Sequence, residues 1–188
     1  MEPVPVNPLE DAALMAASRG GDLQAFAELV RRHQRGLVNF FTRLGAYSYA
    51  EDLAQETFVR LFNYRDRYTP TAKFTTFLYT LARHAWCDTL RKWQRRDKGL
   101  ALLEADAVSR EEERHENKIR RAEAVRAAVE GLPDKLKLVV VLSAYEGFDY
   151  ETIGRIAGIP VGTVKSRMFL AMQRLKEQLK NENETNGT

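Results

Sequence analysis

The chain has 188 residues, one cysteine and a formal net charge of +3, and 44% of its residues are hydrophobic. A single cysteine cannot form an internal disulfide and is too few for a zinc site, which favours a reducing cytosol. No apolar run approaches the ~18 residues of a membrane span, and no signal peptide is evident. Length and composition therefore favour one or two globular domains without membrane insertion.

Almost every segment has the spacing of a helix, and no segment alternates convincingly as a strand would. Gly20 and Gly21 end a short first helix, and Asp22 is placed to cap the next one. Helical spacing of large apolar residues continues to Leu44. The sequence Ser-Tyr-Ala-Glu that begins at Ser48 then has the form of a capping box, which predicts the start of a third helix.

The predicted third helix has one polar side. At 100° per residue, four side chains fall together on that side: Asp52, Gln55, Glu56 and Val59. Apolar side chains fall opposite: Ala54, Phe58 and Leu61. A charged helix face is usually only solvated, but it can also dock a basic or polar partner. The helix alone leaves both interpretations open.

The main basic region of the chain is Arg65–Lys98, with nine Lys and Arg residues against three Asp. It is predicted to contain a loop, Arg67–Lys73, and a fourth helix from about Phe74 to Arg96. One face of this helix mixes aromatic and basic side chains: Tyr79, Arg83, Trp86, Leu90 and Trp93. Aromatic rings beside cations suit unstacked bases and phosphates. In the alternative, Tyr79 and Trp86 belong to the core and only the arginines contact solvent.

Composition changes after the fourth helix. Residues 97–121 are highly charged and poor in large apolar side chains, which predicts a flexible linker. Residues 122–180 regain helical spacing, and residues 181–188 form a polar tail that is expected to be disordered. With residues 9–96 as the first domain, the expected fold class is all-α: two small helical domains joined by the charged linker.

The second domain ends in the pattern of a helix-turn-helix. Gly158 can adopt a left-handed turn at little cost, and Pro160 suits a first helical position. An inward stripe follows at helical steps: Val164, Met168, Ala171 and Leu175. Five residues lie off this stripe, where a DNA groove could be: Thr163, Lys165, Ser166, Arg167 and Phe169.

No catalytic or metal-binding set of residues is found. His33, His84 and His115 are far apart in the sequence and show no ligand spacing with Cys87. The sequence has no phosphate-binding glycine loop and no nucleophile elbow. We therefore expect no metal, no cofactor and no enzymatic activity.

Four motifs in this order resemble a bacterial sigma factor of the extracytoplasmic-function (ECF) group, in the sigma-70 family. They begin with Gly-Asp-Leu-Gln-Ala-Phe at Gly21. The second, Ala50–Phe58, is similar to the region 2 helix that binds the polymerase clamp. The third, Phe74–Arg83, is similar to the part that opens and reads the −10 promoter element. The fourth is Leu132-Pro133 and the helix-turn-helix, similar to region 4, which reads the −35 element.

The resemblance implies a site for each partner. Core RNA polymerase would bind the face of Asp52, Gln55, Glu56 and Val59. The opened −10 strand would contact a specificity loop and the helix that follows it, through Tyr68, Thr71, Lys73, Tyr79, Arg83 and Trp86. The −35 groove would take the recognition helix, through Thr163, Lys165, Ser166, Arg167, Phe169 and Arg174. The family also implies a bacterial cytoplasmic location and an anti-sigma factor as a further partner.

The sequence departs from the family pattern at several positions. Phe77 stands where the family usually has Trp, and His84 stands where Asn is common. Gly154 replaces a usual Ala, which should cost up to ~1 kcal/mol of helix propensity. Leu170 lies where many members have a basic residue, which suggests a shifted −35 preference.

A regulator of a different class is the alternative. A two-domain protein could bind duplex DNA through the same helix-turn-helix without polymerase. It would need an N-terminal sensing or dimerisation domain, and the N-terminal half lacks the alternating strand-helix pattern of a response regulator. Promoter binding with and without core polymerase separates the two hypotheses.

Overall fold

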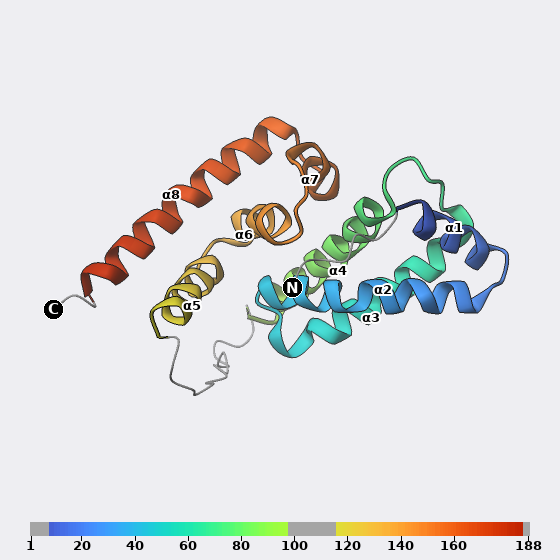
Figure 1. Cartoon of the computed structure of the whole chain (residues 1–188), viewed down its shortest axis with the longest axis horizontal. Coiled ribbons are helices and arrows are strands. Elements are labelled where there is room, and N and C mark those ends of the chain that lie inside the picture. Colours follow the sequence, from blue (N-terminus) through green and yellow to red (C-terminus); the bar gives the residue numbers. More distant parts are fainter. Residues whose placement is uncertain (1–7, 98–115, 186–188) are drawn as a thin grey trace.

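The computed structural model describes residues 8–97 and 116–185, which form helices joined by short turns (Figure 1). No strand occurs among these residues, so the predicted all-α fold is confirmed for the described part of the chain. Most of the predicted linker, residues 98–115, lies outside the described residues, as do residues 1–7 and 186–188.

The N-terminal body holds four α-helices and two short 3₁₀ turns. In chain order these are α1 (Pro8–Arg19), α2 (Leu23–Arg43), η1 (Tyr47–Tyr49), α3 (Ala50–Tyr64), η2 (Arg65–Arg67) and α4 (Phe74–Asp97). Asp22 caps α2 as predicted, because its Oδ1 accepts hydrogen bonds from the backbone N–H groups of Gln24 and Ala25 at 2.9 and 3.0 Å. The capping box at Ser48 does not form. The 3₁₀ turn η1 runs directly into α3, and Tyr49 takes the N-cap position without a side-chain cap.

The C-terminal body holds four α-helices and one π-helical turn. These are α5 (Glu116–Glu130), α6 (Asp134–Val140), the π turn η3 (Val141–Tyr145), α7 (Tyr150–Ala157) and α8 (Val161–Thr185). Two expectations therefore change. Residues 116–121, placed in the linker, begin α5, and residues 181–185, placed in the disordered tail, continue α8.

A carboxylate from the C-terminal body joins the two bodies. Glu146 follows the π turn, and its Oε2 accepts a hydrogen bond from the Tyr79 hydroxyl of α4 at 2.5 Å. Its Oε1 lies 3.3 Å from Nη1 of Arg43, at the end of α2. The Tyr79 ring also packs edge-on against Phe148, with centroids 5.1 Å apart. In Figure 1, α6 and α7 accordingly lie between α8 and α4.

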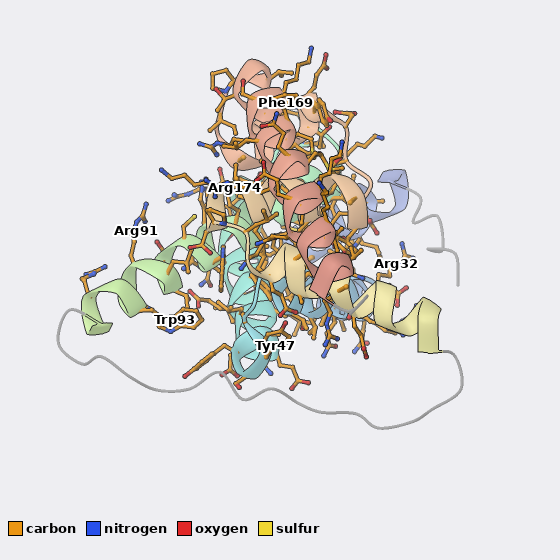
Figure 2. The ribbon with its side chains drawn as sticks, turned by 90° about the vertical axis from the view of Figure 1, so that its left-hand side faces the viewer. Arg32, Tyr47, Arg91, Trp93, Phe169 and Arg174 are labelled. Atoms are coloured by element: carbon orange, nitrogen blue, oxygen red, sulfur yellow. The ribbon has the colours of Figure 1, made fainter. Side chains whose placement is uncertain are left out.

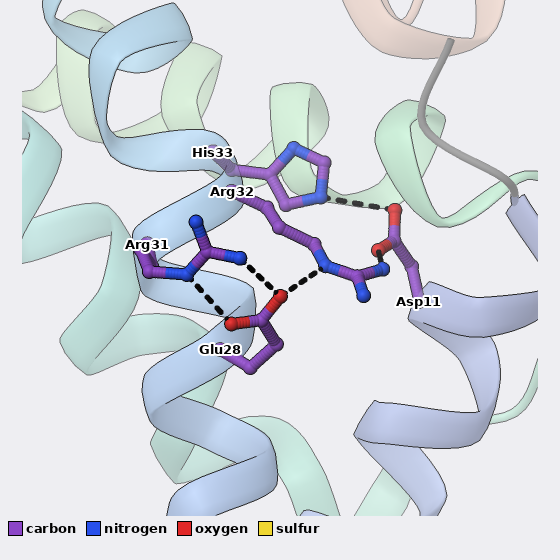
Figure 3. A network of polar contacts seen from close by, with 5 residues as sticks. All are labelled: Asp11, Glu28, Arg31, Arg32 and His33. Atoms are coloured by element: carbon purple, nitrogen blue, oxygen red, sulfur yellow. Dashed lines mark hydrogen bonds and ion pairs between the residues drawn. The ribbon is translucent and has the colours of Figure 1, made fainter. Parts of the chain in front are cut away.

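A polar network fixes α1 on α2 (Figure 3). Asp11 of α1 is fully buried, and its Oδ2 lies 3.0 Å from Nε2 of His33 in α2. Arg32 donates from Nη1 to Oδ1 of Asp11 at 3.1 Å and from Nε to Glu28 at 2.7 Å. Hydrogen bonds from Arg31 and Arg32 lower the pKa of Glu28 to about 2. A buried carboxylate with two partners of this kind specifies where the first helix docks.

Burial lowers the pKa of His33 below its ordinary value of 6.5, against the opposing pull of Asp11. The folded chain therefore binds a proton at this imidazole less readily than the unfolded chain does. The stability that comes from keeping His33 neutral is present above the ordinary pKa and declines as the pH falls through it.

We expect the midpoint of thermal unfolding to fall as the pH is lowered from about 7.5 to about 5.5, through the ordinary pKa of histidine. His33→Gln should have a flatter pH dependence, because glutamine does not titrate. His84→Gln removes an exposed histidine of α4 whose pKa is also lowered, by partial burial and by Arg83 and Arg60, so its curve measures the second contribution to be subtracted from that of His33. Circular dichroism melts at several pH values measure this, and parallel curves for all three proteins would contradict the assignment.

The turn between α7 and α8 depends on two glycines. Gly158 ends α7 in the left-handed region at φ 67°, as predicted from the sequence. Gly154 allows the chain after the turn to approach α7, because a Cβ at this position would lie 3.0 Å from the carbonyl oxygen of Ile159. The departure from the family's Ala thus has a structural reason, and the expected loss of helix propensity is the lesser effect.

We expect Gly154→Ala to lower the free energy of unfolding by about 1–3 kcal/mol, the usual cost of overpacking, even though alanine is the better helix former. Gly162→Ala is the matched control, because a Cβ there meets nothing within 4 Å. This control should be neutral or gain up to about 1 kcal/mol. Denaturant titrations of the two variants decide the point, and equal stabilisation of both would refute the close-approach argument.

Candidate polymerase and nucleic-acid interfaces

The polar face predicted on α3 is present on the surface. Asp52 and Gln55 are exposed, and Val59 is 58% exposed between them and the end of the helix. The opposite side is core, as expected, with Ala54, Phe58 and Leu61 buried. This face is therefore an accessible surface of mixed acidic, amide and apolar character.

Glu56 differs from its neighbours on this face. It is half-buried and bonded to Arg60, whose Nη2 lies 2.5 Å from its Oε1. The same Nη2 lies 2.9 Å from Oδ2 of Asp88 in α4 and lowers the pKa of that carboxyl. Glu56 thus helps to join α3 to α4, and only part of its carboxylate is available to a partner.

The aromatic face predicted on α4 is buried. Tyr79 and Trp86 are 7 and 3% exposed, and Tyr68 at the start of the loop is 8% exposed. Tyr79 is covered by Glu146 and Phe148 of the C-terminal body, while Trp86 packs edge-on against Trp93 at 5.6 Å. The alternative in which Tyr79 and Trp86 are core residues fits the structure, and none of the three rings faces solvent in this arrangement.

Arg83 also faces the C-terminal body. It is half-buried, and its Nη2 lies 4.0 Å from the position that a Cβ on Gly158 would occupy. Its Nε is buried, and no described residue accepts a hydrogen bond from it. In this arrangement the helix-turn-helix covers the guanidinium that was expected to contact phosphate.

The solvent side of α4 lies opposite Tyr79 and was missed in the sequence. Phe77, His84 and Arg91 recur there at helical spacing, the first half-buried and the other two exposed. Tyr64, at the end of α3, is 42% exposed and extends this surface, with its ring 5.2 Å from that of Phe77. Arg91 and Trp93 project from opposite sides of α4 in Figure 2. This surface, named the outer α4 face below, also combines rings with cations.

In the loop before α4, residues 69–73 are exposed and Tyr68 is buried. Thr71 and Lys73 are exposed, whereas the Tyr68 ring packs against the Phe77 ring, with centroids 5.3 Å apart. The loop and the outer α4 face therefore adjoin through Phe77. A single strand could contact both surfaces, although Lys73 of the loop also lies within electrostatic range of Asp149 in the C-terminal body.

The recognition helix α8 presents most of its predicted DNA-contacting residues to solvent. Lys165, Ser166 and Arg174 are exposed, Thr163 and Arg167 are half-buried, and Phe169 is 66% exposed. The Ser166 hydroxyl donates to the Gly162 carbonyl at 2.9 Å, so its lone pairs remain available. The inward stripe is confirmed at Val164, Ala171 and Leu175, which are buried, while Met168 is half-buried. Figure 2 shows Phe169 and Arg174 along the length of α8.

Within residues 8–97 and 116–185, no three His, Cys, Asp or Glu side chains are grouped so that they could hold a metal ion. None of the helices in these ranges combines the length and the hydropathy needed to cross a membrane.

Two family models match the chain. Residues 29–96 match Sigma-70 region 2, and residues 122–175 match Sigma-70, region 4. The ECF RNA polymerase sigma-E factor of Haemophilus influenzae is 30% identical, in an alignment that covers 91% of this chain and 96% of that protein. The ECF RNA polymerase sigma factor SigW of Bacillus subtilis is 32% identical over 85% of this chain and 91% of its own.

Solved structures have the same fold. The sigma factor RpoE in complex with the anti-sigma factor NepR, from Bartonella quintana, is 25% identical with a TM-score of 0.70, and covers 82% of this chain and 96% of that one. The structure of CnrH in complex with the cytosolic domain of CnrY is 22% identical with a TM-score of 0.68, and covers 92 and 98% of the two chains. The regions matched, their order and these relatives place the chain in the sigma-70 family, among the ECF sigma factors of bacterial RNA polymerase.

Proposed function

We propose that the chain binds core RNA polymerase and directs it to promoters by contacting their −35 and −10 elements. The observation that carries the proposal is the presence of two exposed surfaces in one chain: the polar face of α3 and the outward face of the recognition helix α8. The first suits a protein partner, while the second suits the major groove of duplex DNA. Acting as the specificity subunit of a larger enzyme, the chain itself would catalyse no reaction.

Asp52, Gln55 and Val59 form the centre of the proposed polymerase contact. An exposed carboxylate and amide supply hydrogen bonds, and a valine that is 58% exposed supplies apolar area. Glu56 would contribute less, because its carboxylate is already bonded to Arg60.

Asp52→Ala should weaken binding to core polymerase by about 1–3 kcal/mol, since a charged hydrogen-bonding group is removed from the contact. Its thermal stability should stay within about 0.5 kcal/mol of the parent chain, as for other surface changes. Glu51→Ala is the control, because it removes an exposed carboxylate one residue away that points to the side of this face. Titration of labelled core polymerase measures both, and unchanged affinity for Asp52→Ala would overturn the site.

We propose that the opened −10 strand runs along Lys73 and Thr71 of the loop and across the outer α4 face. Tyr64 and Phe77 offer rings on which bases can stack, and Arg91 offers a cation for phosphate. Tyr79 and Arg83 would contact the strand only after the C-terminal body moves away from α4, whereas Trp86 would stay in the core. The buried Tyr68 would support the loop from below.

Arg91→Ala in the holoenzyme should slow promoter opening on linear duplex, and a pre-melted −10 bubble should restore much of the activity. Its matched control is Arg126→Ala on α5. The two arginine side chains are 67 and 70% exposed, and each is paired with an acidic residue of its own helix. The expected loss for Arg91 is about 1–2 kcal/mol of transition-state stabilisation, and added salt should reduce the difference from the parent chain. Equal rates for both variants would rule out a strand contact at Arg91.

Trp86→Ala tests the other face of α4. A core tryptophan should cost about 3–5 kcal/mol of folding stability when truncated, and no bubble template should rescue such a variant. If Trp86→Ala has normal stability and a pre-melted bubble restores its activity, Trp86 contacts DNA instead.

We further propose a cytoplasmic location in a bacterium, where polymerase acts, and control by an anti-sigma factor. The relatives RpoE and CnrH were each solved in complex with another protein, described for RpoE as an anti-sigma factor, which supports the second point. A regulator that acts without polymerase remains distinguishable. It would bind promoter duplex alone, whereas the proposed function requires core polymerase for specific binding.

A further inference from the structure

The recognition helix exposes three large apolar side chains. Phe169, Leu170 and Met172 are 66, 42 and 56% exposed, although the inward side of α8 already supplies Val164, Ala171 and Leu175 to the core. Clustered apolar side chains that stay in water in the free protein usually mark a surface for a partner.

Only two of these three side chains point straight outward. At 100° per residue, Phe169 and Leu170 flank the line through Ser166 that lies opposite Val164 and Ala171. Met172 is turned by roughly 120° from this line, toward the flank that carries Lys165. Phe169 and Leu170 thus form the centre of the outward face of α8, one turn after Lys165 and Ser166.

The charges around this centre indicate a polyanion. Lys165 lies on one flank, while Arg167 and Arg174 lie on the other. Cations on both flanks match the two phosphate backbones that border a groove. The occupant of the centre must then be an apolar group inside the major groove, and the apolar group that a base pair presents there is the C5-methyl of thymine.

Leucine at position 170 also disfavours guanine. Its side chain donates no hydrogen bond, so a guanine edge packed against it would lose water without gaining a partner for O6 or N7. A thymine methyl loses no hydrogen bond in the same place. The contact would favour thymine because its methyl group packs on the leucine, and also because guanine in the same place would lose hydrogen bonds to water.

We infer that Leu170, supported by Phe169, selects a thymine in the −35 element by packing against its methyl group. The inference rests on the proposed function, in which α8 enters the major groove. It adds a base identity and a residue to that function.

The test uses the full chain assembled with core polymerase. Holoenzyme first selects its preferred −35 element from promoter duplexes in which this element is randomised. Each thymine of the selected element is then replaced, one at a time, by deoxyuridine, which keeps the base-pairing groups and removes only the methyl. At one thymine this replacement should weaken binding about fourfold, which corresponds to the ~0.8 kcal/mol of one buried methylene-sized group.

Two variants assign the effect to a side chain. Leu170→Ala should bind the thymine and deoxyuridine promoters with nearly equal affinity, because the surface that contacts the methyl is gone. Met172→Ala is the matched control, an exposed apolar residue of the same helix on its flank, and it should retain the fourfold preference. Leu170 lies at the surface, so both variants should fold as the parent does.

Three results would overturn the inference. In the first, neither strand of the selected element contains a thymine. In the second, every deoxyuridine replacement leaves the affinity unchanged, while Lys165→Ala still lowers it. Leu170→Ala could also weaken binding equally on thymine and deoxyuridine promoters, which would make the apolar centre a contact for a polymerase subunit. In all three, −35 recognition by α8 survives. If the holoenzyme shows no −35 preference at all, the proposed function of α8 fails as well.

Discussion

The burial of α4 on two sides is the constraint on which the rest of the structure depends. Leu78, Ala82 and Ala85 are fully buried, and the rings of Tyr79 and Trp86 extend the buried area around the helix. Helices of the N-terminal body cover part of this area, while Phe148 and Glu146 of the C-terminal body cover Tyr79. The outer α4 face is the side of this helix that stays open to solvent. The proposed −10 contacts on α4 follow from this division.

Small alanines allow the close packing on α4, and the π turn places Glu146 against it. Ala82 and Ala85 are small enough to let the neighbouring helices approach α4 closely. The larger side chains on either side of these alanines then fix the positions of those helices. The extra residue in the π turn Val141–Tyr145 shifts the register of the helix that precedes Glu146. The carboxylate then faces Arg43 and Tyr79 together. Burial raises its pKa, against the opposing effect of these two hydrogen-bond partners.

The sequence was sufficient for several local features. Asp22 predicted a cap, Gly158 predicted a left-handed turn, and the stripe through Val164 and Ala171 predicted which side of α8 is buried. Polar α3 residues such as Asp52 were placed correctly because their helix has one clearly apolar side. In each case a few neighbouring residues determine the conformation, and no contact from a distant part of the chain competes with it.

The sequence was insufficient for α4 because two opposite sides of this helix both carry large apolar side chains. Tyr79 and Phe77 are equally plausible core residues by spacing alone. The difference arises from α7 and Phe148, which lie far along the chain and pack on one side only. The capping box at Ser48 failed for a local reason, since the 3₁₀ turn Tyr47–Tyr49 already sets the entry into α3. Gly154 is the reverse case, in which an apparent defect leaves room for the carbonyl of Ile159.

The edge-on contact between Tyr79 and Phe148 has a calorimetric consequence. Separating the two bodies would bring both rings into water, and exposing apolar surface raises the heat capacity. The enthalpy of separation would therefore increase with temperature, and its free energy would follow a curve with a maximum. Apolar contacts weaken on cooling, whereas the ion pair between Arg43 and Glu146 does not share this dependence. The balance between the joined and separated forms of this chain would thus be set by temperature as well as by its partners.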